Sequence, residues 1–147
     1  MRYLLDTNVL SELNRPEGNP NVRKRFSNLD PKSLFLSVIT IGEICKGVAK
    51  LPKRKKRSNL EGWLLMLEVE FGDKILPFGI ATAQLCGGLV ADAERQGNPI
   101  GLADGQIAAT ALDHGLVVVT RNTKDFLQTG VRLWNIWETD TPGSHQS

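Results

Sequence analysis

Residues 102–120 read LADGQIAATALDHGLVVVT, and this stretch decides the fold class. Apolar side chains recur at helical spacing over residues 103–114, and Gly115 stands where a helix C-terminal cap is expected. Residues 116–120 then form an apolar run with three consecutive valines. A strand without polar alternation is typical of a parallel sheet that is covered on both faces. The stretch therefore predicts a helix followed by a buried parallel strand.

The same kind of unit recurs along the rest of the chain. Residues 3–5 predict a strand that runs into a helix, and this helix ends at the turn over residues 15–18. Residues 34–39 predict a second strand, and the helix after it has an apolar stripe made by Ile41, Ile44, Cys45 and Val48. Further helices are predicted at residues 22–29, 60–71 and 81–95, and short strands at residues 75–78 and 132–136. Strands that alternate with helices predict an α/β fold with a mainly parallel central sheet of four to five strands, covered by helices on both faces (α/β/α).

The length of 147 residues is near the commonest size of a single domain. We expect one domain over residues 1–137 and a flexible C-terminal tail over residues 138–147, because the end of the chain has no apolar anchor. Apolar residues make up 41% of the chain and charged residues 23%. These proportions are typical of a folded chain and exclude a disordered one.

Location and cysteine chemistry follow from short patterns. No stretch approaches the roughly 20 apolar residues that span a bilayer. Asp6 interrupts the N-terminal apolar run too early for a signal peptide. We therefore expect a cytoplasmic protein with no membrane partner. Cys45 and Cys86 are isolated from each other and from histidine, which predicts two reduced core cysteines and no zinc site.

Two stretches of the sequence each allow two interpretations. Lys50 and residues 53–57 hold six of the 18 lysines and arginines, although the net charge is only +2. This basic run is interpreted as a solvated helix–helix connection broken at Pro52, with phosphate contact as the alternative. The apolar cluster at residues 63–67 exceeds one helical face, which predicts core residues or, alternatively, an interface.

Candidate functional residues come where strands end, because ligands bind beyond the carboxyl ends of parallel strands. Asp6 closes the first predicted strand and opens the first helix, although an aspartate there can equally cap the helix N-terminus. Glu43 follows the second strand in the sequence TIGE. With Thr40 at the cap and Glu43 three residues on, this has the form of a capping box, which would explain Glu43 without any function.

Asp104 carries more information than the other acids. By helical periodicity it lies on the arc that is formed by Ile107, Ala108, Ala111 and Leu112. A carboxylate turned toward the body of a protein is costly unless it is hydrogen-bonded or binds a cation, which favours a function for Asp104.

The last predicted strand adds further candidates. Asp125 follows the valine strand, where it is either a fourth site acid or an acid of a surface turn beside Lys124. Asn122 is a weaker, uncharged candidate at the same rim. Asn8, Thr120 and Asn122 are candidates for a supporting role.

Acids that follow separate strands converge in a parallel sheet, and they repel each other unless a cation neutralises them. Oxygen ligands favour Mg²⁺ or Mn²⁺. Such an ion activates water and stabilises the charge that develops during phosphodiester hydrolysis. A Ser-His-Asp arrangement is excluded because the histidines are His114, beside the helix-ending glycine, and His145 in the tail.

Four motifs in this chain together resemble one known family. They are LLDTNVLSEL at residues 4–13, SVITIGEICKGV at 37–48, LADGQIAATALDHGL at 102–116 and VVVTRNTKDF at 117–126. In this order and spacing they resemble the PIN-domain ribonucleases, and within them the VapC-type and FitB-like toxins of toxin–antitoxin pairs. The resemblance covers nearly the whole chain.

The resemblance implies a metal-dependent endoribonuclease whose catalytic acids are Asp6, Glu43, Asp104 and Asp125, with Asp6 and Asp104 as metal ligands. Many members of the family have aspartate at the position of Asn122, so either Asn122 or Asp125 completes the site. The resemblance also implies an RNA substrate such as transfer RNA, a small antitoxin protein and a homodimer.

Two other functions compete with the nuclease. A PIN-like module that binds RNA or protein without catalysis is the main alternative, and the presence of Asp6, Glu43 and Asp104 argues against it. A phosphatase with Asp6 as nucleophile is the other, but Asn8 stands where such an enzyme would need a second acid.

Overall fold

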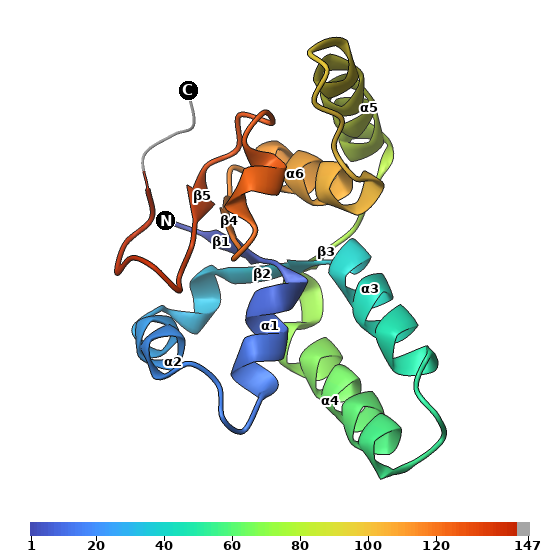
Figure 1. Cartoon of the computed structure of the whole chain (residues 1–147), viewed down its shortest axis with the longest axis vertical. Coiled ribbons are helices and arrows are strands. Elements are labelled where there is room, and N and C mark those ends of the chain that lie inside the picture. The colour runs from blue at the N-terminus through green and yellow to red at the C-terminus, as the bar shows by residue number, and fades with distance from the viewer. Residues whose placement is uncertain (144–147) are drawn as a thin grey trace.

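The centre of the molecule is a parallel sheet (Figure 1). The computed structural model describes residues 1–143. Its five strands are ordered β3-β2-β1-β4-β5, and every neighbouring pair is parallel. The strands are β1 (Tyr3–Leu5), β2 (Leu34–Ser37), β3 (Ile75–Leu76), β4 (Val117–Val119) and β5 (Leu133–Trp134). The predicted α/β fold is therefore confirmed.

Helices cover both faces of this sheet. They are α1 (Thr7–Asn14), α2 (Pro20–Ser27), α3 (Val38–Ala49), α4 (Lys55–Phe71), α5 (Ile80–Arg95) and α6 (Leu102–His114), with 3₁₀ turns at Pro31–Ser33, Gly72–Lys74 and Thr123–Phe126. In Figure 1, α1, α2 and α4 lie on one side of the sheet, and α5 and α6 lie on the other. Gly115 ends α6 in the left-handed conformation, at φ 65°, as its position predicts.

Alternating side chains of the strands build two separate cores. In β1, Tyr3 and Leu5 pack in the core beneath α1 and α4, whereas Leu4 packs with Ile107 of α6 on the opposite face. In β4, Val118 also packs with α6, between two valines that face the first core. Both faces of each central strand are therefore buried, and this explains why the strands carry no polar alternation.

The predicted capping box is wrong. Helix α3 begins directly after β2, so the last strand residue, Ser37, is its N-cap and accepts a hydrogen bond from the Ile39 N–H at 3.0 Å. Thr40 is buried within the helix, and among the described residues its hydroxyl has no hydrogen-bond partner. Because α3 starts three residues earlier than a cap at Thr40 requires, Glu43 is free of a capping role.

Three burial predictions are also wrong. Cys86 is buried as predicted, but Cys45 is exposed because it lies about 100° around α3 from the buried Ile44. On α4, Leu67 is buried, but Leu65 and Met66 are 62% and 59% exposed. The cluster at residues 63–67 is therefore only partly core, and its interface alternative stays open. On α6, Leu112 is 36% exposed and so lies outside the buried arc.

The basic run divides between a connection and a helix. Helix α4 begins at Lys55, five residues before the predicted start, so three of the basic residues belong to its first turn. The guanidinium of Arg57 donates a hydrogen bond to the carbonyl of Leu51 at 3.1 Å and holds the turn around Pro52. The other cations of the run are exposed, and a role in phosphate contact stays a prediction.

The end of the described chain folds back on the sheet. Arg25 pairs with Asp140 at 2.7 Å, and the Trp134 indole donates a hydrogen bond to the Thr139 carbonyl at 3.1 Å. Residues 144–147, which include His145, lie outside the described residues, and the division into 1–137 and a flexible tail stays a prediction. Within residues 1–143, no helix combines the length and the apolar character that crossing a membrane requires.

Candidate active site

Asp6 lies at the carboxyl end of β1 and is only 8% exposed. One carboxylate oxygen, Oδ1, accepts a hydrogen bond from the Thr7 N–H at 2.8 Å, so the predicted helix cap is present. The other oxygen, Oδ2, accepts from the Thr120 hydroxyl at 2.8 Å. Burial raises the pKa of Asp6, and these two hydrogen bonds oppose that rise by stabilising the ionised form.

Thr120 joins the ends of β1 and β4. Its fully buried hydroxyl donates to Asp6 and accepts hydrogen bonds from the Asn8 side-chain amide and the Asn122 N–H, each at 3.1 Å. The Asn8 side-chain oxygen in turn accepts from the Arg121 N–H at 3.2 Å. The predicted supporting residues therefore form one hydrogen-bonded network around Asp6.

Glu43 approaches this network from α3. Its Oε1 accepts a hydrogen bond from the Thr7 hydroxyl at 3.0 Å, so Thr7 contacts both Asp6 and Glu43. Partial burial raises the pKa of Glu43, and the charge of Asp6 raises it further. Glu43 is therefore near enough to Asp6 for the two carboxylates to repel each other.

Asp104 lies in the first turn of α6 and is half-buried. Its pKa is raised to about 6, first by burial and then by the charges of Asp125, Asp6 and Glu43. The sequence predicts that Asp104 lies on the inward-facing arc of α6, and the structure shows it half-buried, with its side chain bordering two surface cavities. Asp104 therefore lies close enough to the other three acids for their charges to repel its own.

Two cavities meet at Asp104. One has a volume of about 480 Å³ and contains Asp6, Glu43 and Asn122 in its lining. The other has a volume of about 300 Å³ and contains Asp125 in its lining. The two candidates for the fourth position, Asn122 and Asp125, therefore border different cavities, although they belong to one turn in which the Asp125 N–H donates to the Asn122 carbonyl at 3.1 Å.

The larger cavity is also lined by residues that were not predicted from the sequence. These include Arg121 and Trp137, which come two and three residues after the ends of β4 and β5, together with Arg15 of the α1–α2 turn. The rule that functional residues follow strands applies to the first two. The sequence analysis does not name them, because it infers the site from the acids and from their uncharged polar neighbours.

The donor set fits a hard divalent cation. Carboxylate and amide oxygens surround the larger cavity, and the acids raise one another's pKa, which an ion of charge +2 would relieve. Within residues 1–143, no three His, Cys, Asp or Glu side chains are gathered tightly enough to hold a metal between them. This arrangement agrees with Mg²⁺, which takes one or two carboxylates directly and keeps several waters.

Without metal, Asp104→Asn is expected to stabilise the protein at neutral pH. Because the folded-state pKa of Asp104 is about 6, against an ordinary value of 3.8, the folded form binds its proton more tightly than the unfolded form. The stability that the protonated Asp104 contributes to the wild type is therefore fully present below pH 4 and is lost as the pH rises through about 6. At pH 7 the free energy of unfolding of Asp104→Asn should therefore exceed that of the wild type by about 1 kcal/mol, a value reduced for solvent screening at the half-exposed side chain. This corresponds to a rise of roughly 2–4 °C in Tm.

Thermal unfolding in EDTA at pH 5 and pH 7 measures this effect. Asp92→Asn is the matched control, because Asp92 is an exposed acid on α5 whose ion pair is with Arg95 of the same helix. Equal melting temperatures for the wild type and Asp104→Asn at pH 7 would contradict the proposed repulsion.

The comparison with known families decides the classification. The PIN domain family model matches residues 3–131. The chain belongs to the PIN-domain family. This confirms the resemblance, and the match includes all four acids of the site.

Toxins and ribonucleases are among the proteins to which the chain is similar. The chain is 40% identical over 138 residues to the toxin FitB of Neisseria gonorrhoeae, covering 91% of this chain and 97% of FitB. It is 38% identical over 139 residues to the VapC ribonuclease Y4jK of Sinorhizobium fredii, covering 92% and 97%. A tRNA(fMet)-specific endonuclease VapC of Shigella flexneri is 33% identical over 134 residues, covering 88% and 93%.

Solved PIN-domain structures share the fold over nearly their whole length. The FitAcB structure from Neisseria gonorrhoeae aligns with a TM-score of 0.85 at 37% identity, covering 93% of this chain and 99% of that chain. A toxin–antitoxin complex from Klebsiella pneumoniae aligns with a TM-score of 0.68 at 27% identity, covering 93% and 99%.

Proposed function

We propose that this PIN domain is a metal-dependent endoribonuclease, the toxin of a toxin–antitoxin module that acts on RNA in the cytoplasm. The observation that carries the proposal is the group formed by Asp6, Glu43, Asp104 and Asp125. The four acids come from separate elements and repel one another around the same pair of cavities. The similarity to VapC ribonucleases over nine-tenths of the chain supports the same activity.

Asp6 and Asp104 would hold Mg²⁺ or Mn²⁺, which supplies an activated water and neutralises charge on the phosphodiester. Asp6 presents its carboxylate in one fixed orientation, because Thr7 and Thr120 hold both of its oxygens. Glu43 is held by Thr7 at the exposed side of the cavity and is placed to accept a proton from water. Its raised pKa brings it closer to neutrality, where a general base works best.

RNA is the proposed substrate, and transfer RNA is the proposed class. Arg15 and Arg121 line the cavity beside the acids and supply positive charge for the RNA phosphates. The relation to a tRNA(fMet)-specific endonuclease supports transfer RNA.

Cleavage of total RNA tests the proposed function. The purified protein without antitoxin is expected to cut discrete bands from transfer RNA in Mg²⁺, to lose this activity in EDTA, and to regain it when Mg²⁺ is restored. Ribosomal RNA in the same sample serves as the internal control for substrate choice. Cleavage that persists in EDTA would exclude the metal-dependent mechanism.

A catalytically inactive module that binds RNA or protein is the remaining alternative. The presence of all four acids and the relation to named ribonucleases favour the nuclease. Calorimetry with Mn²⁺ distinguishes the two, because an inactive module would bind no metal at these acids.

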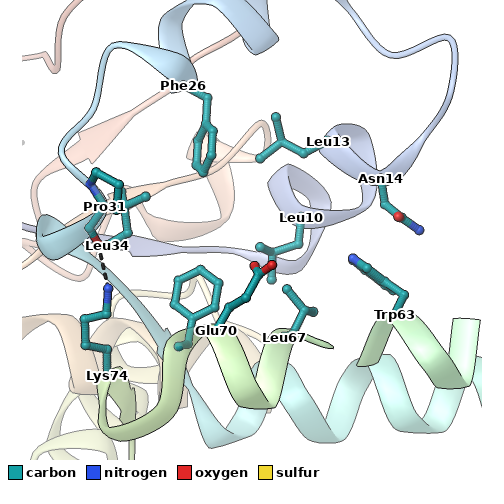
Figure 2. A pocket seen from close by; sticks show the side chains of 11 residues that line it. Leu10, Leu13, Asn14, Phe26, Pro31, Leu34, Trp63, Leu67, Glu70 and Lys74 are labelled. Atoms are coloured by element: carbon teal, nitrogen blue, oxygen red, sulfur yellow. Dashed lines mark hydrogen bonds between the residues drawn. The ribbon is translucent and has the colours of Figure 1, made fainter. Parts of the chain in front are cut away.

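The antitoxin is the proposed protein partner, and the complexes among the structural relatives support it. A cavity of about 320 Å³ lies between α1, α2 and α4, away from the acids (Figure 2). Leu13, Phe26 and Trp63 line it with half-buried apolar side chains, and Glu70 reaches into it from α4. We propose that an apolar segment of the antitoxin occupies this groove.

Trp63→Ala is expected to weaken antitoxin binding about 30-fold, because a half-buried tryptophan in a pocket is the commonest kind of binding hot spot. The probe is the product of a short reading frame beside the gene, titrated by calorimetry. Glu68→Ala is the matched control, since Glu68 lies exposed on the same helix but outside the groove. Equal affinity of wild type and Trp63→Ala would reject the groove as the docking site.

A homodimer is the second proposed assembly. Five large apolar side chains on α4, α5 and α6 are more than half exposed, namely Leu65, Met66, Val69, Ile80 and Leu102. Exposed apolar patches mark protein interfaces. Sedimentation of the isolated protein is expected to give twice the chain mass of 16.2 kDa, and a monomer at micromolar concentration would contradict the dimer.

A further inference from the structure

Arg121 and Trp137 form a cationic and aromatic surface in the larger cavity, the one that Asp6, Glu43 and Asp104 also line. Both residues line this cavity, and the guanidinium carbon of Arg121 lies 5.3 Å from the centre of the Trp137 ring. Arg121 follows the end of β4 and Trp137 follows the end of β5, which pairs with β4. A planar cation and a large aromatic ring therefore lie at the same rim as Asp6 and Asp104.

Hydrogen bonds hold the backbone of both residues. The Asn135 side chain accepts a hydrogen bond from the Trp137 N–H at 3.0 Å and donates one to the Arg121 carbonyl at 3.4 Å. The Arg121 N–H donates to Asn8, whose amide contacts Thr120. The Trp137 ring packs against the core, so one face of the pair is supported. The position of the pair is thereby fixed relative to the acids.

Arg121 has no competing charge partner. Arg15, the other arginine of the cavity, pairs with Glu12 at 3.1 Å. Among the described residues, no carboxylate lies within ion-pair distance of the Arg121 guanidinium. Arg121 is exposed, and its charge and its planar face are therefore available to a ligand of this cavity.

We propose that Trp137 and Arg121 form a stacking surface for one nucleobase of the RNA beside the scissile phosphodiester. This inference rests on the proposed nuclease function and adds residues that position the substrate. Unpaired RNA bases stack on aromatic rings and on guanidinium planes. Such stacking tolerates any base, so the surface would orient the strand and leave sequence choice to other contacts.

The charge at this surface favours RNA over a protein segment. A basic antitoxin side chain would be attracted by the acids but repelled by Arg121. Because the core and Arg121 cover the Trp137 ring, a base would stack on the exposed face of the guanidinium, with the ring behind it, and a neighbouring phosphate would contact the guanidinium edge. An acidic peptide would in turn be repelled by the four carboxylates, and it has no base to stack on the pair.

Binding to two uncleaved probes tests the proposal. The first probe is a labelled octamer of adenosine nucleotides, and the second is an eight-residue abasic ribose-phosphate chain of equal charge. All variants carry Asp104→Asn, so that neither probe is cut. We expect the parent to bind the octamer about 10-fold more tightly than the abasic chain, because only the octamer has bases to stack.

Four variants separate stacking from charge and from stability. Trp137→Leu and Arg121→Lys are each expected to lose about 10-fold in octamer affinity while binding the abasic chain as the parent does. Trp137→Phe retains an aromatic ring and is expected to keep most of the affinity. Arg95→Lys, an exposed change on α5, is the control that should alter neither affinity. Because Arg121 is exposed, its variant tests the idea even if Trp137→Leu folds poorly.

Three outcomes would overturn the proposal. Unchanged octamer affinity in Arg121→Lys and Trp137→Leu would show that no base stacks there, and equal losses on both probes would show a purely electrostatic contact. Retained RNA affinity with weakened antitoxin binding would assign the surface to the protein partner. Failure of the parent to bind either probe would instead contradict the proposed nuclease function itself.

Discussion

Asp104→Asn and Asp6→Asn are each expected to reduce RNA cleavage by more than about 100-fold, the upper end of what loss of an outer-shell metal partner costs. Each substitution replaces a carboxylate by an amide of nearly the same shape. The charge that would hold Mg²⁺ is lost, whereas the packing of β1 and α6 is kept. Cleavage rates on transfer RNA at saturating Mg²⁺ measure the effect.

The folding of these variants must be separated from their chemistry. Asp104→Asn should be at least as stable as the wild type in EDTA, because it removes repulsion from Asp125, Asp6 and Glu43. Asp92→Asn on α5 controls for the loss of one negative charge and should cleave normally. Wild-type cleavage by Asp104→Asn would mean that the observed activity belongs to a contaminant or to another site.

Thr120→Val is expected to reduce cleavage by about 10- to 100-fold without altering any metal ligand. The substitution keeps the side-chain shape but removes the hydroxyl that donates to Asp6 Oδ2, and it leaves Asn8 and the Asn122 N–H without their shared acceptor. Because these groups are buried or half-buried and lose a hydrogen-bond partner, the free energy of unfolding should also fall by about 1–3 kcal/mol.

Two further variants make the Thr120 result specific. Thr120→Ser retains the hydroxyl and should recover most of the activity, which a purely structural role of the methyl group would not predict. Thr110→Val is the matched control, because Thr110 is equally buried but its hydroxyl donates only to the Gln106 carbonyl of its own helix. A similar loss of cleavage in Thr110→Val would point to general destabilisation.

Local patterns were sufficient to predict much of the fold and the approximate place of the site. The valine strand, the glycine cap of α6 and the strand–helix order are properties of neighbouring residues, and the structure confirms them. Asp6 and Glu43 were predicted from their position after strands. Parallel topology brings such positions to one edge of the sheet, so convergence of the acids follows from the order of the elements.

Predictions that depended on helix ends and helix faces were less reliable. The pattern of Thr40 and Glu43 satisfies a capping box, but the abrupt passage from β2 into α3 gives the cap to Ser37. The apolar character of Cys45 and Leu65 also fits a buried face, yet neither is covered within the chain. What covers a helix depends on its neighbours in space, and apolar periodicity does not contain that information.

By itself, the sequence determined the α/β class, the parallel sheet and the acids at its edge, because these depend on residue type and chain order. Only the tertiary structure decided how the site is assembled. Thr120 contacts Asp6 across 114 positions of sequence, and Asn135 joins Arg121 to Trp137. It also placed Asn122 and Asp125 in the linings of two different cavities that share Asp104. Such contacts join side chains that are remote along the chain, and their geometry is fixed only when both cores pack around the sheet.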